Sequence, residues 1–377
     1  MQILRRTTEY TLPTGTNFKL VYCWLLMQCL LLSLHGIYIG GEAGKYVYEA
    51  HRLLATQDLS SNNYLLYITT IGLIYISVKA GAGFYLALLA QLSLNLLATL
   101  SFHKLAQKFT DKTTAFLATI SLITFYPYQQ FNFFLQTESI YFSLVVLLTS
   151  YILRLTSLHL SSFLAILLAV AVLTVTRPTG LLVSVPVFLY LHFAFMRKKN
   201  QFIVIPAYMI ALIIAGIIFN AIMGSGGELN FLLPFVQEHI ICGVPTRLVP
   251  GISFSQQDNS IIGVLTYVSN HAEQVLQLGI KRSIAFFGLY RDYFSTVHNT
   301  LNIAAFSLLY IFMFFSLYYW AVRNKVIACY FLFFIAVTWF TVIFTCDDWH
   351  NRFILCLVPM FLLLALPALG RFLRKIY

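Results

Sequence analysis

The stretch YLLYITTIGLIYISV (Tyr64–Val78) decides how this chain passes through a membrane. It is apolar and 15 residues long, whereas a helix needs about 20 residues to cross the hydrocarbon core of a bilayer. Longer apolar runs recur along the whole chain of 377 residues, which is 59% hydrophobic and only 10% charged. Soluble domains carry about 25% charged residues. We therefore predict an all-α, polytopic membrane protein. The predicted spans are roughly 20–39, 82–102, 114–128, 139–156, 161–176, 180–196, 202–222, 300–321, 326–345 and 353–370.

The positions of the basic residues indicate that 64–78 does not cross. If 64–78 does not cross and the N-terminus is cytoplasmic, the segments on the cytoplasmic side carry 15 of the 24 lysines and arginines. They carry only two of the 13 acids, Glu9 and Asp111. If it does cross, the later basic loops face outward, against the positive-inside rule. The sequence thus predicts ten spans, both termini in the cytoplasm, and an interfacial or re-entrant helix at 64–78. The net charge of +11 then reflects orientation, so no nucleic-acid partner is expected.

Residues 1–377 are predicted to form a single membrane domain with two long external segments. The first, 40–81, would contain interfacial helices, and the second, 223–299, would form a larger external loop. Most of the six cysteines lie in or beside apolar runs, and none forms a CxxC pair. We expect them to be small membrane-embedded residues rather than a disulfide framework or a metal site.

The stretch GGEAGKYVYEA (40–50) places Glu42 where the first span ends. The glycines around it allow a tight exit from the helix, and the residues that follow have the spacing of an amphipathic surface helix, with Glu49, His51 and Arg52 on its wet face. A partly desolvated carboxylate at this depth suits a general base. Alternatively, Glu42 is a charged residue at the membrane interface that ends the first helix and has no catalytic role.

Two short corners on the same predicted side hold further ionisable groups. In LQTES, Glu138 opens a span behind Thr137, which could cap that helix. Alternatively, Glu138 meets Glu42 to form a paired acidic site. In TRPTGLL, Arg177 lies between two apolar spans, where an unpaired arginine is costly. It is either an ordinary polar corner or a phosphate-binding cation.

The last external corner, CDDWHNRF, contains Asp347, Asp348, His350 and Arg352. A single histidine beside two aspartates is a weak metal pattern, and a His/Arg pair facing a lipid phosphate fits better. The segment 280–299 is basic and amphipathic, and it carries Arg291 and His298. It is either an interfacial anchor for anionic lipid or a lid whose cations hold a lipid-linked phosphate.

Together these motifs resemble those of the GT-C class of membrane glycosyltransferases, which includes protein O-mannosyltransferases and lipid A aminoarabinose transferases. The resemblance runs from about residue 20 to residue 370. Each motif is short, and it is their order and sidedness that are specific. Two departures are the absence of a second acid beside Glu42 and the absence of a large soluble domain after the spans. The motifs are GGEAGKYVYEA, HKLAQKFTDK, FYPYQQF, LQTES, TRPTGLL, YRDYFSTVHN and HNRFILCLVP.

The resemblance implies a GT-C-like fold and an inverting transfer of a sugar from a polyprenyl-phosphate donor. The acceptor would be a glycan, lipid or protein on the external face of the membrane, expected to be a bacterial inner membrane. Glu42 would be the catalytic base, and Glu138 would orient the base or the acceptor. This interpretation requires no cofactor. Binding of a divalent cation at the site is an alternative that the sequence does not decide. The phosphate would contact cations from the set Lys45, Arg177, Arg291, His298, His350 and Arg352.

Two other functions remain open from the sequence. A transporter or flippase for lipid-linked saccharides would also gather polar groups at the membrane, although transporters usually show internal repeats and broken helices at the midplane. A polymerase or ligase for lipid-linked saccharides would also have a large external loop.

Overall fold

The computed structural model describes residues 14–196, 230–247 and 258–376, with Pro206, Ile213, Gly216, Ile217 and Asn220 described singly. Regular structure in these residues is helical, apart from two isolated β-bridges. The predicted all-α class is therefore confirmed for the described part of the chain.

Five helical segments among the described residues are long and apolar enough to cross a membrane. Their outward side chains include many large apolar ones, such as Leu26 on the first helix (54% exposed) and Phe314 on α14 (70% exposed). Such surfaces suit contact with lipid, as expected of a membrane protein. The five segments are α1 (Thr14–His35), α4 (Tyr85–Phe109), α14 (Thr296–Arg323), α15 (Lys325–Phe344), and the continuous run of η3 (Pro178–Val183), α9 (Ser184–Leu191) and η4 (His192–Met196).

The other predicted spans are represented by shorter or more polar-ended helices. They are α5 (Lys112–Thr124), α7 (Glu138–Ile152), α8 (Leu160–Thr176), and α16 (Arg352–Leu355) followed by α17 (Val358–Ile376). The predicted span at 202–222 lies almost entirely outside the described residues. The structure therefore supports a helical membrane protein.

The first of the two predicted external segments, 40–81, folds into α2 (Glu42–Thr56), η1 (Asn62–Tyr67) and α3 (Ile68–Lys79). The 12 residues of α3 extend about 18 Å at 1.5 Å per residue. By itself this length is less than the thickness of the hydrocarbon core, and the absence of a crossing at 64–78 stays a prediction. The buried face of α2, with Tyr46 and Ala50, packs against Ile71 and Ile74 of α3.

The prediction that Glu49 lies on the wet face of α2 is wrong. Its side chain is 1% exposed, and its carboxylate accepts hydrogen bonds from the backbone N–H and the hydroxyl of Ser60. The chain after α2 turns back over the helix and supplies these donors, so the charge is buried with partners.

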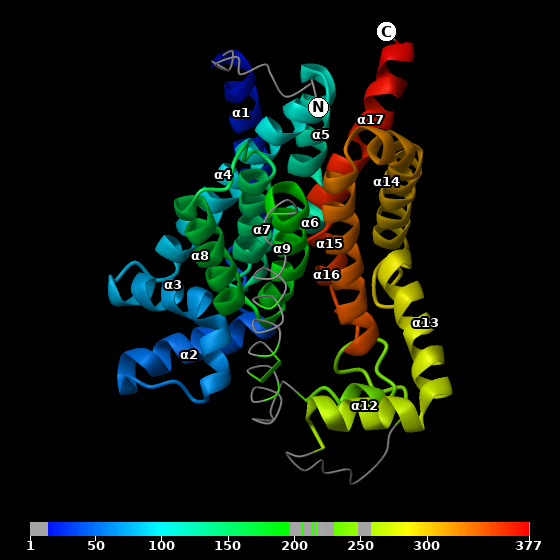
Figure 1. Ribbon diagram of the computed structural model, residues 1–377. Coiled ribbons are helices and arrows are strands. Elements are labelled where there is room, and N and C mark those ends of the chain that lie inside the picture. The colour runs from blue at the N-terminus through cyan, green and yellow to red at the C-terminus, as the bar shows by residue number, and fades with distance from the viewer. Residues whose placement is uncertain are drawn as a thin grey trace.

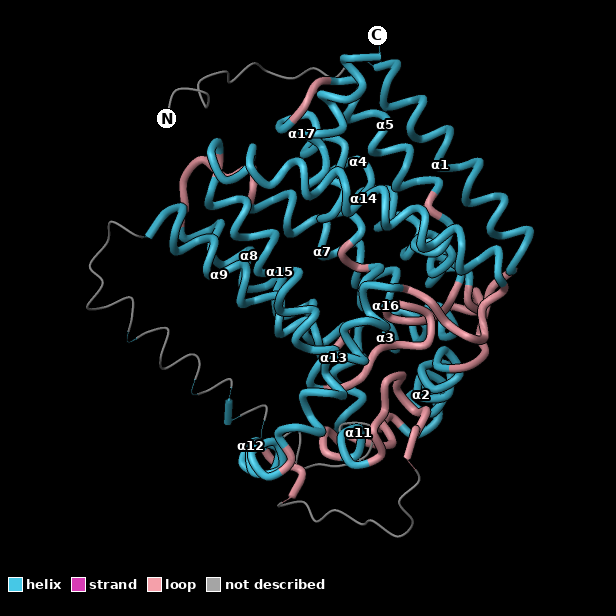
Figure 2. The backbone as a smooth tube through the Cα atoms, turned by 90° about the vertical axis from the view of Figure 1, so that its right-hand side faces the viewer, coloured by secondary structure: helices cyan, strands magenta, loops and turns pink. Residues whose placement is uncertain are grey.

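The second predicted external segment, 223–299, contains α11 (Leu233–Val236), α12 (Ile261–Asn270) and α13 (Ala272–Gly288) among its described residues. Figures 1 and 2 place α12 at the same end of the molecule as α2, with its axis across the direction of the long helices. The start of α1 and the end of α17 lie at the opposite end (Figure 1). The two predicted external segments therefore share one end.

A disulfide joins Cys242 of this second segment to Cys346, directly after α15. The expectation that the cysteines are merely membrane-embedded small residues is wrong for this pair. The two residues are 104 positions apart and lie in unrelated motifs, so their pairing depends on the tertiary structure.

The most buried helices begin at the candidate site. Twelve of the 15 residues of α7 are buried, starting with Glu138, and nearly every side chain of α17 from Val358 to Ala368 is buried in the same core. Two short helices, α6 (Tyr126–Gln129) and η2 (Gln130–Phe133), lead into α7. Because close-packed helices are rigid, α7 and the α16–α17 pair hold their first residues in fixed positions.

Candidate active site

Arg352 is the centre of a network of ion pairs at the end of the bundle where α2, α7 and α16 meet. Its Nη1 atom donates to Glu42 and, at 2.8 Å, to Oε1 of Glu138. Its Nε and Nη2 atoms donate to the two carboxylate oxygens of Asp348, so this pair is bidentate. One guanidinium group thus holds three carboxylates that come from distant parts of the chain.

Arg177 extends the network on its other side. Its Nη1 atom lies 3.0 Å from Oε1 of Glu138, the oxygen that Arg352 also contacts. Its guanidinium also lies over the ring of Phe353, at 5.0 Å from the centroid. Burial opposes the charge on Arg177, but the Glu138 carboxylate outweighs it, and the pKa of the guanidinium is raised. Arg177 is therefore a permanent cation of the site.

The loops before α2 and α7 are tied together, which brings the two glutamates into one place. The backbone N–H of Tyr38 donates to the carbonyl of Phe133 (2.8 Å), and that of Leu135 donates to the carbonyl of Tyr38 (3.1 Å). Gly41, immediately before Glu42, has a φ of 58°, in the region where glycine is favoured. The tight turn into α2 thus sets Glu42 beside Glu138.

A second ion pair supports the Asp348 side of the network. Arg291, in the loop between α13 and α14, bonds to the carboxylate of Asp347 and, at 3.3 Å, to the carbonyl of Asp348. Burial raises the pKa of Asp347 to about 6 even though Arg291 opposes this. Burial alone would also raise the pKa of Asp348, but the Arg352 guanidinium holds it below its usual value.

The Cys242–Cys346 disulfide lies beside Asp347 and Asp348, and hydrogen bonds next to it hold these residues in place. The backbone N–H of Asp347 donates to the carbonyl of Ile240 (2.8 Å), that of Cys242 donates to the carbonyl of Asp347 (2.8 Å), and the indole of Trp349 donates to the carbonyl of Cys242. The second external segment is thereby tied to the residues next to Asp348.

The two predicted histidines lie at the edge of the network. The rings of His298 and His350 both stack on Phe294, with centroids at 4.1 and 6.4 Å. Part of the His350 residue is open to solvent while its ring lies among neighbouring side chains, and its backbone N–H donates to Asp348 (3.1 Å). Desolvation lowers the pKa of His350, so the arginines are the permanent positive charges here.

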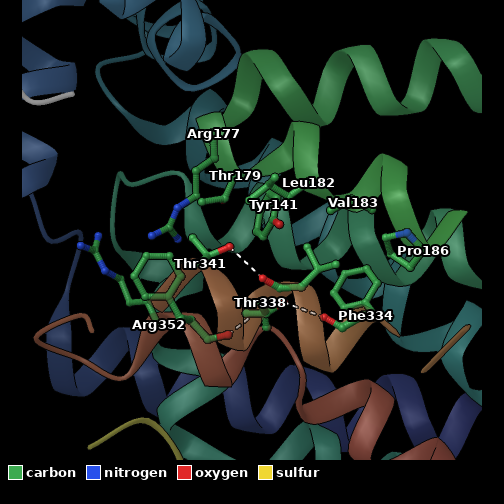
Figure 3. Close-up of a pocket in the computed structure, with 13 residues that line it drawn as sticks. Tyr141, Arg177, Thr179, Leu182, Val183, Pro186, Phe334, Thr338, Thr341 and Arg352 are labelled. Atoms are coloured by element: carbon green, nitrogen blue, oxygen red, sulfur yellow. Dashed lines mark hydrogen bonds between the residues drawn. The ribbon is translucent and has the colours of Figure 1, made fainter. Parts of the chain in front are cut away.

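Beside the network lies a narrow cavity of about 20 Å³, which is room for about one water molecule. Figure 3 shows the guanidinium groups of Arg177 and Arg352 at one end of it and Pro186 and Phe334 at the other. The two ends match the polarity of an amphiphilic ligand, although the cavity is far smaller than the roughly 300 Å³ or more of a ligand pocket. The pocket is lined by Tyr141, Arg177, Thr179, Leu182, Val183, Pro186, Phe334, Val337, Thr338, Thr341, Arg352, Phe353 and Cys356.

The structure thus brings together Glu42, Glu138, Arg177 and Arg352 in direct contact, with His350 beside them. Arg291 has only 2% of its side chain exposed and is committed to Asp347, so here it supports the corner and is not open to a ligand. Lys45 is exposed on α2, one helical turn after Glu42.

Two residues in or beside the ion-pair network were not predicted from the sequence as site residues. Asp348 was considered only in a weak metal pattern, yet it forms the bidentate pair with Arg352, and its spacing of four residues from that arginine was the available signal. Tyr46 is buried close enough to Glu42 and Glu138 that, after burial itself, these acids contribute to raising the pKa of its hydroxyl. Nothing in its local sequence singled it out among 23 tyrosines.

In the part of the chain that the structure describes, no three His, Cys, Asp or Glu side chains are grouped so that they could hold a metal ion. The carboxylates of the network are occupied by arginines instead. A divalent cation at Glu42 stays a prediction.

Comparison of the chain with protein-family models, with curated proteins and with solved structures gave no match. The function therefore has to be argued from the site itself.

Proposed function

We propose that this protein is a membrane glycosyltransferase of the GT-C type that uses a polyprenyl-phosphate sugar as its donor. The observation that carries the proposal is the convergence of Glu42, Glu138, Arg177 and Arg352 at the charged end of an otherwise apolar pocket. Such a site offers a carboxylate for the acceptor and cations for a departing phosphate.

The donor lipid would place its phosphate on Arg177 and Arg352. Arginine suits this role because its planar fork donates two parallel hydrogen bonds to a phosphate. The isoprenoid chain would follow the apolar wall formed by Val183, Pro186 and Phe334, and these side chains would have to move apart to admit it, because the cavity of about 20 Å³ is too small for a prenyl chain.

Glu42 is the better general base of the two glutamates. Its side chain is 29% exposed, whereas that of Glu138 is fully buried. The acceptor hydroxyl or amine would attack the anomeric carbon from the face opposite the phosphate and lose its proton to Glu42. The bond between the anomeric carbon and the phosphate oxygen breaks, and the electron pair leaves with the polyprenyl phosphate. Glu138 then acts as a positioning residue that keeps the two arginines together.

Arg352 connects donor binding to the base. In the structure its Nη1 atom is held by Glu42. A phosphate that takes over this donor would release the Glu42 carboxylate for proton transfer. Glu42 would therefore become available only when the donor is bound. Without the donor, its pairing with Arg352 avoids an unpaired carboxylate in the partly buried site.

The finer topology belongs to the same proposal. Ten spans with both termini in the cytoplasm would place the site on the external side of the membrane. The Cys242–Cys346 disulfide supports this sidedness, because disulfides persist in oxidising compartments outside the cytoplasm. Single cysteines placed at Lys45 and Lys375 in a background with the exposed free cysteines removed would test it. A membrane-impermeant maleimide should label intact cells at position 45 and not at position 375.

The activity test is incubation of the purified, lipid-reconstituted protein with a series of synthetic polyprenyl-phosphate sugars and candidate acceptors, followed by mass analysis of the products. We expect free polyprenyl phosphate and a glycosylated acceptor. Glu42→Gln should lower turnover about 10²–10⁴-fold, the range for loss of a general base, while the folded yield is unchanged.

Glu273→Gln is the matched control, because Glu273 is an exposed acid on α13 outside the network. Wild-type turnover in Glu42→Gln would remove Glu42 as the base. Movement of the intact lipid-linked saccharide across the membrane, without transfer of the sugar, would instead identify a flippase. Extension of a lipid-linked glycan chain would identify a polymerase.

A further inference from the structure

A second pocket lies at the opposite end of the bundle, far from Arg352. It is formed where α4 ends, α5 begins and α17 ends, with α14 beside them, and its volume is about 400 Å³. Figure 1 shows the ends of α5, α14 and α17 together at this end of the molecule. The pocket is lined by Lys108, Phe109, Thr110, Asp111, Tyr319, Pro367, Arg371 and Arg374.

The charge of this pocket is positive and only partly compensated. It has three cations, Lys108, Arg371 and Arg374, and one carboxylate, Asp111. Asp111 already caps α5, accepting from the backbone N–H of Thr114 (2.9 Å) and from its hydroxyl (2.8 Å). Asp111 keeps its single negative charge, and the Arg374 guanidinium is among the groups that lower its pKa. One negative charge cannot balance three positive ones, so the pocket stays positive.

The cations retain donors for a ligand. The Nζ atom of Lys108 donates one hydrogen bond, to the carbonyl of Leu153 (2.7 Å), and an ammonium has three donors. The Nε atom of Arg371 donates to Pro367, and its guanidinium lies 5.9 Å from the centre of the Tyr319 ring. Among the described residues, Arg374 has no hydrogen bond and no carboxylate within ion-pair distance.

Close packing brings the end of α17 and the start of α5 together at this pocket. A Cβ atom at Gly370 would lie 2.9 Å from the hydroxyl of Thr110, so α17 approaches the start of α5 closely there. Arg371 and Arg374 follow on the next turn of the same helix and are thereby held beside Asp111.

The surroundings favour a lipid over a free anion. Around the cations, Phe109, Tyr319 and Pro367 form apolar walls, and Phe372 (51% exposed) and Tyr318 (79% exposed) present large side chains outward nearby. A site with cations at its centre and aromatic rings at its rim matches the phosphate and the upper acyl chains of a lipid in the bilayer.

We propose that this pocket binds the phosphodiester headgroup of an anionic membrane lipid, through Lys108, Arg371 and Arg374. It is separate from the candidate active site, and the proposal does not depend on the transferase activity. The bound lipid would neutralise the uncompensated charge and link the ends of α4, α14 and α17.

The test is native mass spectrometry of the purified full-length protein with phosphatidylglycerol and phosphatidylcholine of identical acyl chains. The wild-type protein should retain phosphatidylglycerol about tenfold or more over phosphatidylcholine. The double variant Arg371→Gln/Arg374→Gln should bring this ratio close to one, whereas Arg371→Lys/Arg374→Lys should keep most of the preference because it keeps the charge.

The matched control is Arg323→Gln/Lys325→Gln, which removes two exposed cations at the neighbouring corner between α14 and α15 and should leave the ratio unchanged. Equal retention of the two lipids by the wild-type protein would overturn the proposal, whether or not the variants fold. If the control pair lost the preference for phosphatidylglycerol to the same extent, the preference would come from general surface charge. That result would also overturn the proposal. Binding of inorganic phosphate without a lipid preference would identify a free-anion site instead.

Discussion

At the end where α2, α7 and α16 meet, three carboxylates and two arginines are ion-paired and largely buried. At the opposite end, three exposed cations line a pocket that contains a single carboxylate. The first arrangement joins residues that are up to 310 positions apart. The second consists of residues at helix ends, where basic side chains reach toward lipid headgroups.

The difference indicates that charge serves two purposes in this protein. Buried charges without partners are strongly unfavourable, so a network such as that around Arg352 must be held by the whole fold. Exposed cations at helix ends cost little and contribute to orientation and lipid contact. Substitutions at the two ends should therefore have very different effects.

The largest effect is expected from Glu138→Gln. This change leaves Arg177 and Arg352 without the buried carboxylate that they share, and breaking a buried ion pair costs about 3–5 kcal/mol. We expect the melting temperature in detergent to fall by about 5–10 °C and transferase turnover to be lost. The same measurements on Glu273→Gln should match the wild type. A variant with normal melting temperature and normal turnover would show that the network is not required at this end.

A smaller loss is expected when the disulfide is removed by Cys242→Ser/Cys346→Ser. Loss of a native disulfide costs about 2–4 kcal/mol, and the corner that carries Asp348 would be less well fixed. We expect a melting temperature several degrees lower and a reduced turnover. Cys329→Ser, which changes an exposed free cysteine of α15, is the control. If the double variant behaved like this control, the disulfide would have no part in holding the site.

The pH dependence of stability should reveal Asp347. Because burial raises the pKa of Asp347 in the folded protein to about 6, above its usual value near 4, the folded state binds a proton that the unfolded state has released. The contribution of this group to stability is therefore greatest below pH 4 and is lost as the pH rises through 6.

Asp347→Asn removes this titration. The difference in melting temperature between the variant and the wild type should shift in favour of the variant between pH 5 and pH 7.5. A constant difference across this range would indicate that Asp347 does not titrate there.

The smallest effect on stability is expected at the opposite end. Arg374→Gln removes an exposed cation that has no ion-pair partner among the described residues, and such changes usually alter stability by less than about 0.5 kcal/mol. Turnover and melting temperature in neutral lipid should be unchanged. If Arg374→Gln lowered the melting temperature and turnover as much as Glu138→Gln does, the two ends of the molecule would not differ as described.

The sequence by itself determined the helical class and the membrane character of the chain, and it predicted the arrangement of the segments along the membrane normal. Apolar runs, the positions of lysine and arginine, and the short length of 64–78 follow from the cost of placing charge and unpaired backbone in hydrocarbon, and these effects act locally. The same reasoning singled out Glu42, Glu138, Arg177 and Arg352 as polar groups at one predicted face.

Only the tertiary structure decided how these groups are paired. The assignment of Arg352 to three carboxylates, the burial of Glu49, the engagement of Arg291 by Asp347 and the pairing of Cys242 with Cys346 all depend on contacts between distant segments. No local pattern encodes such contacts, because the partner of a buried charge is set by which helices pack together and not by its neighbours in the chain.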